Sequence, residues 1–81
     1  MEQRQEQEQA ELVTMQKAYK AAVDEWIAAL KAEEELALVD PTVAQVDEWE
    51  GAHFKEDEAR NRAKQAKKNY EDAIRQRLFK F

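Results

Sequence analysis

Alanine recurs at every seventh residue in the second half of the chain, at Ala52, Ala59, Ala66 and Ala73. A strict seven-residue repeat keeps one stripe of an α-helix turned toward a partner helix, and alanine in that stripe lets the two backbones approach closely. A second set at the same spacing is interleaved with these alanines and comprises Trp49, Glu56, Ala63, Tyr70 and Arg77. The two sets predict a helix over about residues 41–78 that packs along another helix.

The partner helix is predicted in the first half of the chain, over about residues 9–38. From Leu12 onward, apolar side chains recur with the helical period and fall on one broad face. This face includes Tyr19, Val23, Trp26, Ile27 and Leu30. Residues 1–10 are rich in Gln and Glu and offer almost nothing to bury, so we expect them to form a frayed extension of this helix.

A break between the two helices is predicted at the only proline. Proline cannot continue a helix without losing a hydrogen bond and disfavours helical geometry at the residue before it, yet it suits the first position of a new helix. We therefore expect a turn at 39–41, with Asp40 capping a second helix that begins at Pro41. A turn this short forces the helices to lie antiparallel. The predicted fold class is all-α, a coiled-coil-like two-helix antiparallel hairpin forming a single domain over residues 1–81.

Folding the chain at this turn predicts which residues meet. Residue i should lie near residue 81 minus i, give or take a turn, so Trp26 is expected near Glu56 and Tyr19 near Ala63. Large side chains then face small ones, which is how packed helices interdigitate.

The residue types on which many enzymes depend are scarce. The chain has no Cys, one His and one Gly, and it contains no Ser. A nucleophilic triad, a cysteine-ligated zinc ion and a glycine-rich phosphate loop therefore cannot be built within it. We expect a protein that is not an enzyme and uses no cofactor. No apolar run approaches the ~18 residues of a membrane span, so we also expect no membrane partner and a cytoplasmic location.

One partner helix cannot cover all the apolar residues, which predicts self-association. The predicted interface residues are Tyr19, Val23, Trp26, Ile27, Leu30, Trp49, Ala52, Phe54, Ala59, Ala63, Ala66, Tyr70, Ala73 and Ile74. Monomers seldom expose a large apolar patch, so we expect two hairpins to pair as a homodimeric four-helix bundle. We interpret the function as that of a small, non-catalytic oligomeric interaction or assembly module, with an unidentified protein as the other candidate partner.

Charge predicts the orientation of the hairpins in that dimer. Residues 24–59 carry 12 acidic and 2 basic side chains, whereas residues 1–23 and 60–81 together carry 6 acidic and 11 basic ones. Each hairpin is therefore acidic toward its turn and basic toward its open end. Turns at opposite ends of the dimer bring unlike charges together, so we expect an antiparallel homodimer.

A metal-binding bundle is the first alternative function. Glu50 precedes His53, the only histidine, by three residues, which sets both side chains on one face of a helix. Di-metal carboxylate bundles use this spacing together with further glutamates from neighbouring helices. In this alternative, Glu33 or Glu34 supplies the ligand from the first helix.

A nucleic-acid accessory protein is the second alternative. Basic residues form one stripe on the second predicted helix: Arg60, Lys64, Lys67, Lys68 and Arg75. Such a stripe can contact phosphates, but the net charge of minus 5 and the lack of a recognised binding motif argue against nucleic acid.

Overall fold

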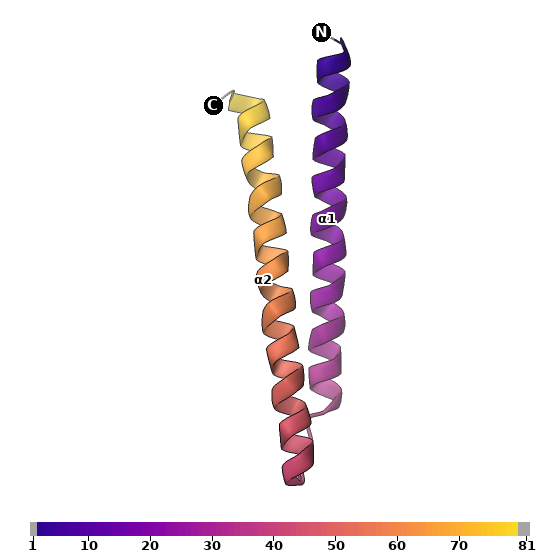
Figure 1. Ribbon diagram of the computed structural model, residues 1–81, viewed down its shortest axis with the longest axis vertical. Helices are drawn as coiled ribbons and strands as arrows, with labels where there is room; N and C mark the ends of the chain where they lie inside the picture. The colour runs from indigo at the N-terminus through magenta and orange to yellow at the C-terminus, as the bar shows by residue number, and fades with distance from the viewer. Residues whose placement is uncertain (1, 80–81) are drawn as a thin grey trace.

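The computed structural model describes residues 2–79 of the chain, which form two long helices joined by one connection. Helix α1 spans Glu2–Glu35 and helix α2 spans Val43–Phe79, and this part of the chain contains no strand. The helices run antiparallel and side by side in a molecule that measures 63 × 19 × 14 Å (Figure 1). The predicted fold class, an all-α two-helix antiparallel hairpin, is confirmed; Met1, Lys80 and Phe81 lie outside the described residues.

The first helix ends earlier than predicted. Three consecutive glutamates, Glu33 to Glu35, occupy the last turn of α1, which carries no basic residue. Negative charge at the C-terminal end of a helix interacts unfavourably with the helix dipole, so the charges of this turn do not stabilise the helix end. The chain tightens there, because the amides of Leu36 and Ala37 donate to the carbonyls of Glu33 and Glu34, three residues back, at 3.2 and 3.1 Å. The connection therefore covers residues 36–42 instead of 39–41.

The residue that caps the second helix is Thr42, so the prediction of Asp40 is wrong. The Thr42 hydroxyl oxygen accepts from the Gln45 amide at 3.3 Å, and Gln45 Oε1 accepts from the Thr42 amide at 2.8 Å. This reciprocal capping box satisfies two amides that a helix N-terminus otherwise leaves without partners. Pro41 then lies before the cap instead of in the first turn, and α2 begins at Val43.

The N-terminal segment continues α1 to Glu2, ahead of the predicted start at about residue 9. Gln and Glu are good helix formers, so the backbone can remain helical without burying these side chains. Residues 6–11 are all exposed. Fraying of this segment stays a prediction.

The contact between the two helices has a narrow core of small side chains. Ala59 and Ala63 of α2 are each 2% exposed and Ala22 of α1 is 9% exposed, and no large side chain among the described residues is fully buried. Larger residues lie half-buried at the edges of this core, including Tyr19 and Tyr70, whose ring centroids are 6.4 Å apart. The core therefore leaves most large apolar side chains in partial contact with solvent.

The pairing between helices partly follows the predicted register. Trp26 lies against Glu56 as expected, and its indole Nε1 donates to Glu56 Oε1 at 2.7 Å. The ring of Tyr19 also lies 6.4 Å from that of Tyr70, which is about two turns beyond Ala63 along α2. The pairing of Tyr19 with Ala63 stays a prediction. The connection is longer than predicted and continues past the end of α1 beside the first turns of α2, so these turns extend beyond α1 (Figure 1).

Candidate functional site

The first candidate site is centred on Glu56, a carboxylate buried between the helices. Its side chain belongs to the seven-residue repeat of α2 and therefore points toward α1, and only 4% of the residue is exposed. Ala52 and Ala59 flank it along the same stripe and leave room for the carboxylate. Burial of a carboxylate is costly unless it is hydrogen-bonded, and the Trp26 indole supplies the only hydrogen bond that Glu56 makes within the described residues.

Two further ligand-type side chains converge on the same point. His53 lies three residues before Glu56 on α2, and its Nδ1 is 3.1 Å from Oε1 of Glu33, in the last turn of α1. One ligand-type atom from each of Glu33, His53 and Glu56 lies within 4.8 Å of the other two. On its far side, His53 Nε2 is 4.0 Å from Oδ2 of Asp57. We call Glu33, His53 and Glu56 the interhelical cluster.

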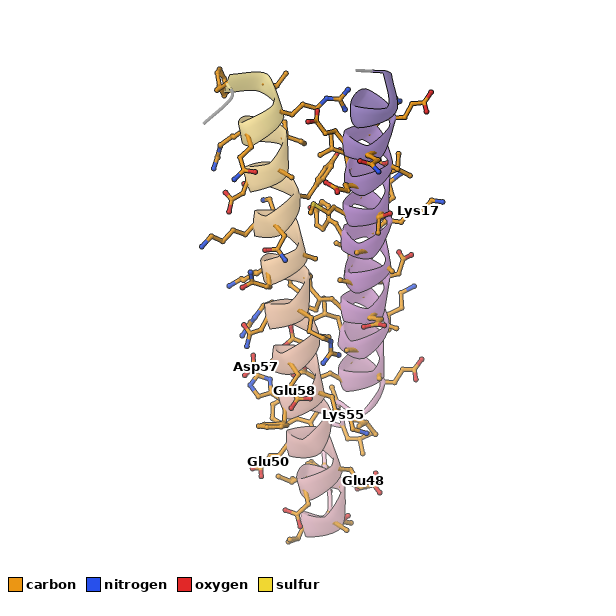
Figure 2. The ribbon with its side chains drawn as sticks, turned by 45° about the horizontal axis from the view of Figure 1, so that its top comes forward. Lys17, Glu48, Glu50, Lys55, Asp57 and Glu58 are labelled. Atoms are coloured by element: carbon orange, nitrogen blue, oxygen red, sulfur yellow. The ribbon has the colours of Figure 1, made fainter. Side chains whose placement is uncertain are left out.

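Only one glutamate of this cluster, Glu33, is among the predicted ligands. Glu33 and His53 are brought together, but Glu50 and Glu34 are exposed and belong to no cluster of ligand-type groups among the described residues. Figure 2 shows Glu48 and Glu50 on the first turns of α2, which lie beyond the end of α1. The reason is positional: the repeat of α2 passes through residue 56, so Glu56 faces α1 and Glu50 does not.

The role of Glu56 in this cluster was not predicted, although the sequence held two signals for it. His53 and Glu56 have the three-residue spacing that places two side chains on one helix face. The folding rule also placed Glu56 near Trp26. The sequence did not specify which residues of α2 lie beside Glu33.

The second candidate site is formed by the predicted interface residues, which divide into three groups. Ala59 and Ala63 are buried. The half-buried residues are Tyr19, Val23, Trp26, Ala52, Ala66, Tyr70, Ala73 and Ile74. The exposed residues are Ile27, Leu30, Trp49 and Phe54, with exposed fractions of 44%, 42%, 42% and 65%. The hairpin alone therefore covers only part of the predicted interface.

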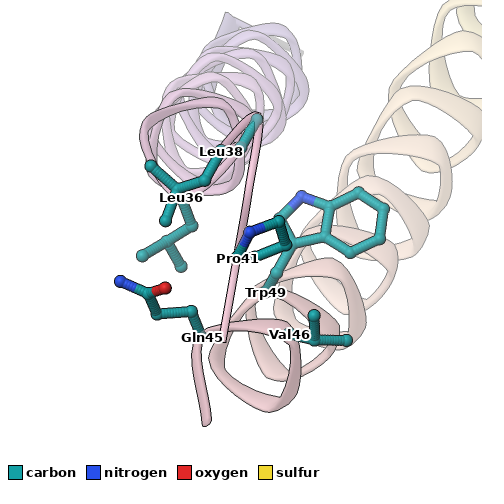
Figure 3. Close-up of a pocket in the computed structure, with 7 residues that line it drawn as sticks. Leu36, Leu38, Pro41, Gln45, Val46 and Trp49 are labelled. Carbon is teal, nitrogen blue, oxygen red and sulfur yellow. The ribbon is translucent and has the colours of Figure 1, made fainter. Parts of the chain in front are cut away.

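An apolar hollow lies beside the connection, where α2 extends beyond α1. Its volume is about 240 Å³ (Figure 3). Its lining comprises Leu36, Ala37, Leu38, Pro41, Gln45, Val46 and Trp49. Pro41 and Val46 occupy the positions before the cap and in the second turn that commonly pack together at a helix start. We call this feature the turn-end hollow.

The basic stripe of α2 is partly neutralised by its own helix. Arg60 pairs with Asp57, Lys67 lies 3.9 Å from Glu71, and Arg75 lies 3.5 Å from Asp72. Lys64 and Lys68 are exposed. The paired carboxylates reduce the positive potential that this stripe offers to a phosphate backbone.

Neither α1 nor α2, over the residues that the structure describes, is long and apolar enough to cross a membrane. Comparisons with family models, with curated proteins and with solved structures find no match for the chain.

Proposed function

We propose that this hairpin is a non-catalytic assembly module that works as an antiparallel homodimer, two hairpins forming a four-helix bundle. The observation that carries the proposal is the set of large apolar side chains that the contact between α1 and α2 leaves exposed. Besides those of the predicted interface, they include Val13, Leu38, Val39, Val43, Val46, Leu78 and Phe79. A second copy of the chain carries the same exposed apolar side chains and the same separation of charge, so it is the partner we propose.

An apolar row on α1 offers a contact for the second copy. Val23, Ile27 and Leu30 follow one another at spacings of four and three residues, so they lie on one face of the helix. Val23 is half-buried, while Ile27 and Leu30 are more than two-fifths exposed. Complete burial of such a side chain contributes about 1.5–3 kcal/mol relative to full exposure, so a partner helix that covers the exposed parts of Ile27 and Leu30 gains a fraction of this.

The charges at the two ends of the hairpin favour one relative orientation of the two copies. The hairpin gathers residues 24–59, with 12 acidic and 2 basic side chains, at the turn end. Residues 6–23 and 60–79, with 9 basic and 5 acidic side chains, lie toward the open end. Two copies with their turns at opposite ends place each acidic end beside a basic one. Two copies with their turns together crowd the acidic ends.

Apolar groups at the two ends complement each other in the same arrangement. Leu78 and Phe79 at the open end are 68% and 63% exposed. In an antiparallel dimer of full overlap, they lie near the turn-end hollow of the second copy. Trp49 and Val46 then gain apolar neighbours that the single hairpin does not provide.

Sedimentation equilibrium with one substitution in the apolar row tests this proposal. The parent chain, of 9.5 kDa, should sediment at twice that mass at micromolar concentration. Ile27→Glu should dissociate the dimer, because it places a charge inside the proposed contact. Ala28→Glu is the matched control: it adds the same side chain at the adjacent exposed position, which points away from the row, and should leave the dimer intact. A parent that remains monomeric, or two variants that behave alike, would contradict the proposal.

A further inference from the structure

The interhelical cluster combines the donor types that bind transition metals. It offers two carboxylates and one imidazole, contributed by both helices of a single hairpin, so it does not depend on self-association. Zinc is commonly bound by His nitrogen and by Asp or Glu oxygen. From these donors and their placement, the geometry points to a binding site for one divalent transition-metal ion, Zn²⁺, held by Glu33, His53 and Glu56.

The distances suit such an ion. Tetrahedral zinc with bonds of about 2.0–2.1 Å holds neighbouring ligand atoms about 3.3 Å apart. The separation between His53 Nδ1 and Glu33 Oε1 is 3.1 Å. Glu56 offers an oxygen within 4.8 Å of both partners, so rotation of a flexible carboxylate completes the set.

The charges around the cluster also favour a cation. Two carboxylates converge there, one of them 4% exposed, and no Lys or Arg among the described residues forms an ion pair with either. Glu33 also sits in a last helical turn that carries three glutamates and no basic residue, where positive charge is stabilising. A divalent ion between Glu33 and Glu56 removes the repulsion between the two carboxylates and places positive charge at the C-terminal end of α1.

The surrounding groups are placed as supports for the ligands. Carboxylates that bind metals are themselves hydrogen-bonded, and the Trp26 indole already donates to Glu56 at 2.7 Å. A histidine that binds metal through one nitrogen commonly directs the other toward a carboxylate, and Asp57 lies 4.0 Å from His53 Nε2. The His53 side chain is 57% exposed, which leaves a path for the ion and a coordination position open to water.

Titration of the metal-free chain with Zn²⁺ alone, followed by calorimetry at neutral pH, tests the site. One ion should bind per chain, and Co²⁺ in its place should give the intense visible absorption of a four-coordinate ion. Glu33→Gln, His53→Gln and Glu56→Gln should each weaken binding by at least about tenfold. Glu56→Gln keeps an oxygen for the Trp26 indole, so circular dichroism should show an intact helical fold.

Glu50→Gln and Glu34→Gln are the matched controls. Each removes one carboxylate from the acidic end of the hairpin without touching the cluster, so each should leave the affinity within about twofold of the parent. A second readout is thermal: Zn²⁺ should raise the melting temperature of the parent, since it links α1 to α2, and should not raise that of His53→Gln. Absence of binding in the parent would overturn the site. Equal losses in the cluster variants and the controls would also overturn it.

Discussion

Between Glu56 and Ala63, α2 is packed against α1, whereas from Val43 to Gly51 every residue of the same helix is exposed. The first region is filled by alanines and one hydrogen-bonded carboxylate. The second carries Val43, Val46 and Trp49, which are 81%, 37% and 42% exposed. The two regions therefore differ in what they contribute to the single chain: the middle of the hairpin holds the helices together, and the turn end leaves apolar side chains exposed.

Overpacking of the middle should give the largest effect on stability. Ala59→Leu inserts three carbon atoms where the residue is 2% exposed, and overpacking of this kind costs about 2 kcal/mol. The expected loss corresponds to a melting temperature lower by roughly 8–16 °C for a chain of this size. Ala44→Leu, at an exposed position of α2, is the control and should change stability by less than about 0.5 kcal/mol. If the two variants melt together, the middle and the turn end do not differ as described.

Removal of the buried hydrogen bond should have the next largest effect. Trp26→Phe keeps an aromatic ring but deprives Glu56 of its donor, which should cost about 1.5 kcal/mol, because a hydrogen bond to a charged group is lost. Chemical unfolding at fixed protein concentration, with a chelator present, measures this loss. Trp49→Phe is the control at the turn end, where the indole makes no hydrogen bond among the described residues. An equal loss in both variants would mean that ring packing, and not the bond to Glu56, supports Trp26.

Loss of the helix cap should have the smallest effect of the three. Thr42→Ala removes the hydroxyl that accepts from the Gln45 amide, which should cost about 1 kcal/mol of the free energy of unfolding. Thr14→Ala is the same substitution inside α1, where the hydroxyl donates to the Ala10 carbonyl. Because alanine is the better helix former, that variant should be slightly more stable than the parent. If Thr42→Ala and Thr14→Ala change the free energy of unfolding by the same amount and in the same direction, the capping box does not stabilise the start of α2.

Long-range periodicity made the hairpin predictable. The seven-residue repeat of α2 and the single proline are enough to give two antiparallel helices, and the folding rule placed Trp26 beside Glu56. Each of these features extends over many residues or depends on a single strong helix breaker. They therefore survive small errors in where the helices begin and end.

Local competition made the turn harder to predict. Asp40 before Pro41 and Thr42 before Gln45 are both reasonable helix starts, and only the structure shows that the reciprocal bonds of the second are formed. The interhelical cluster depends on which residues of α2 lie beside the end of α1, so the sequence pointed to Glu33 and His53 but did not single out Glu56.

A distance between the turns of two copies tests the proposed assembly most directly. The chain has no Cys, so Asp40→Cys gives a single site for a spin label in the exposed connection. In an antiparallel dimer the two labels should lie tens of ångströms apart, approaching the 63 Å length of the hairpin. Pulsed electron-spin resonance should show this long distance as one narrow population. A separation below about 20 Å would place the turns together, and the absence of any dipolar coupling would mean that the hairpins do not pair; either result would contradict the antiparallel dimer.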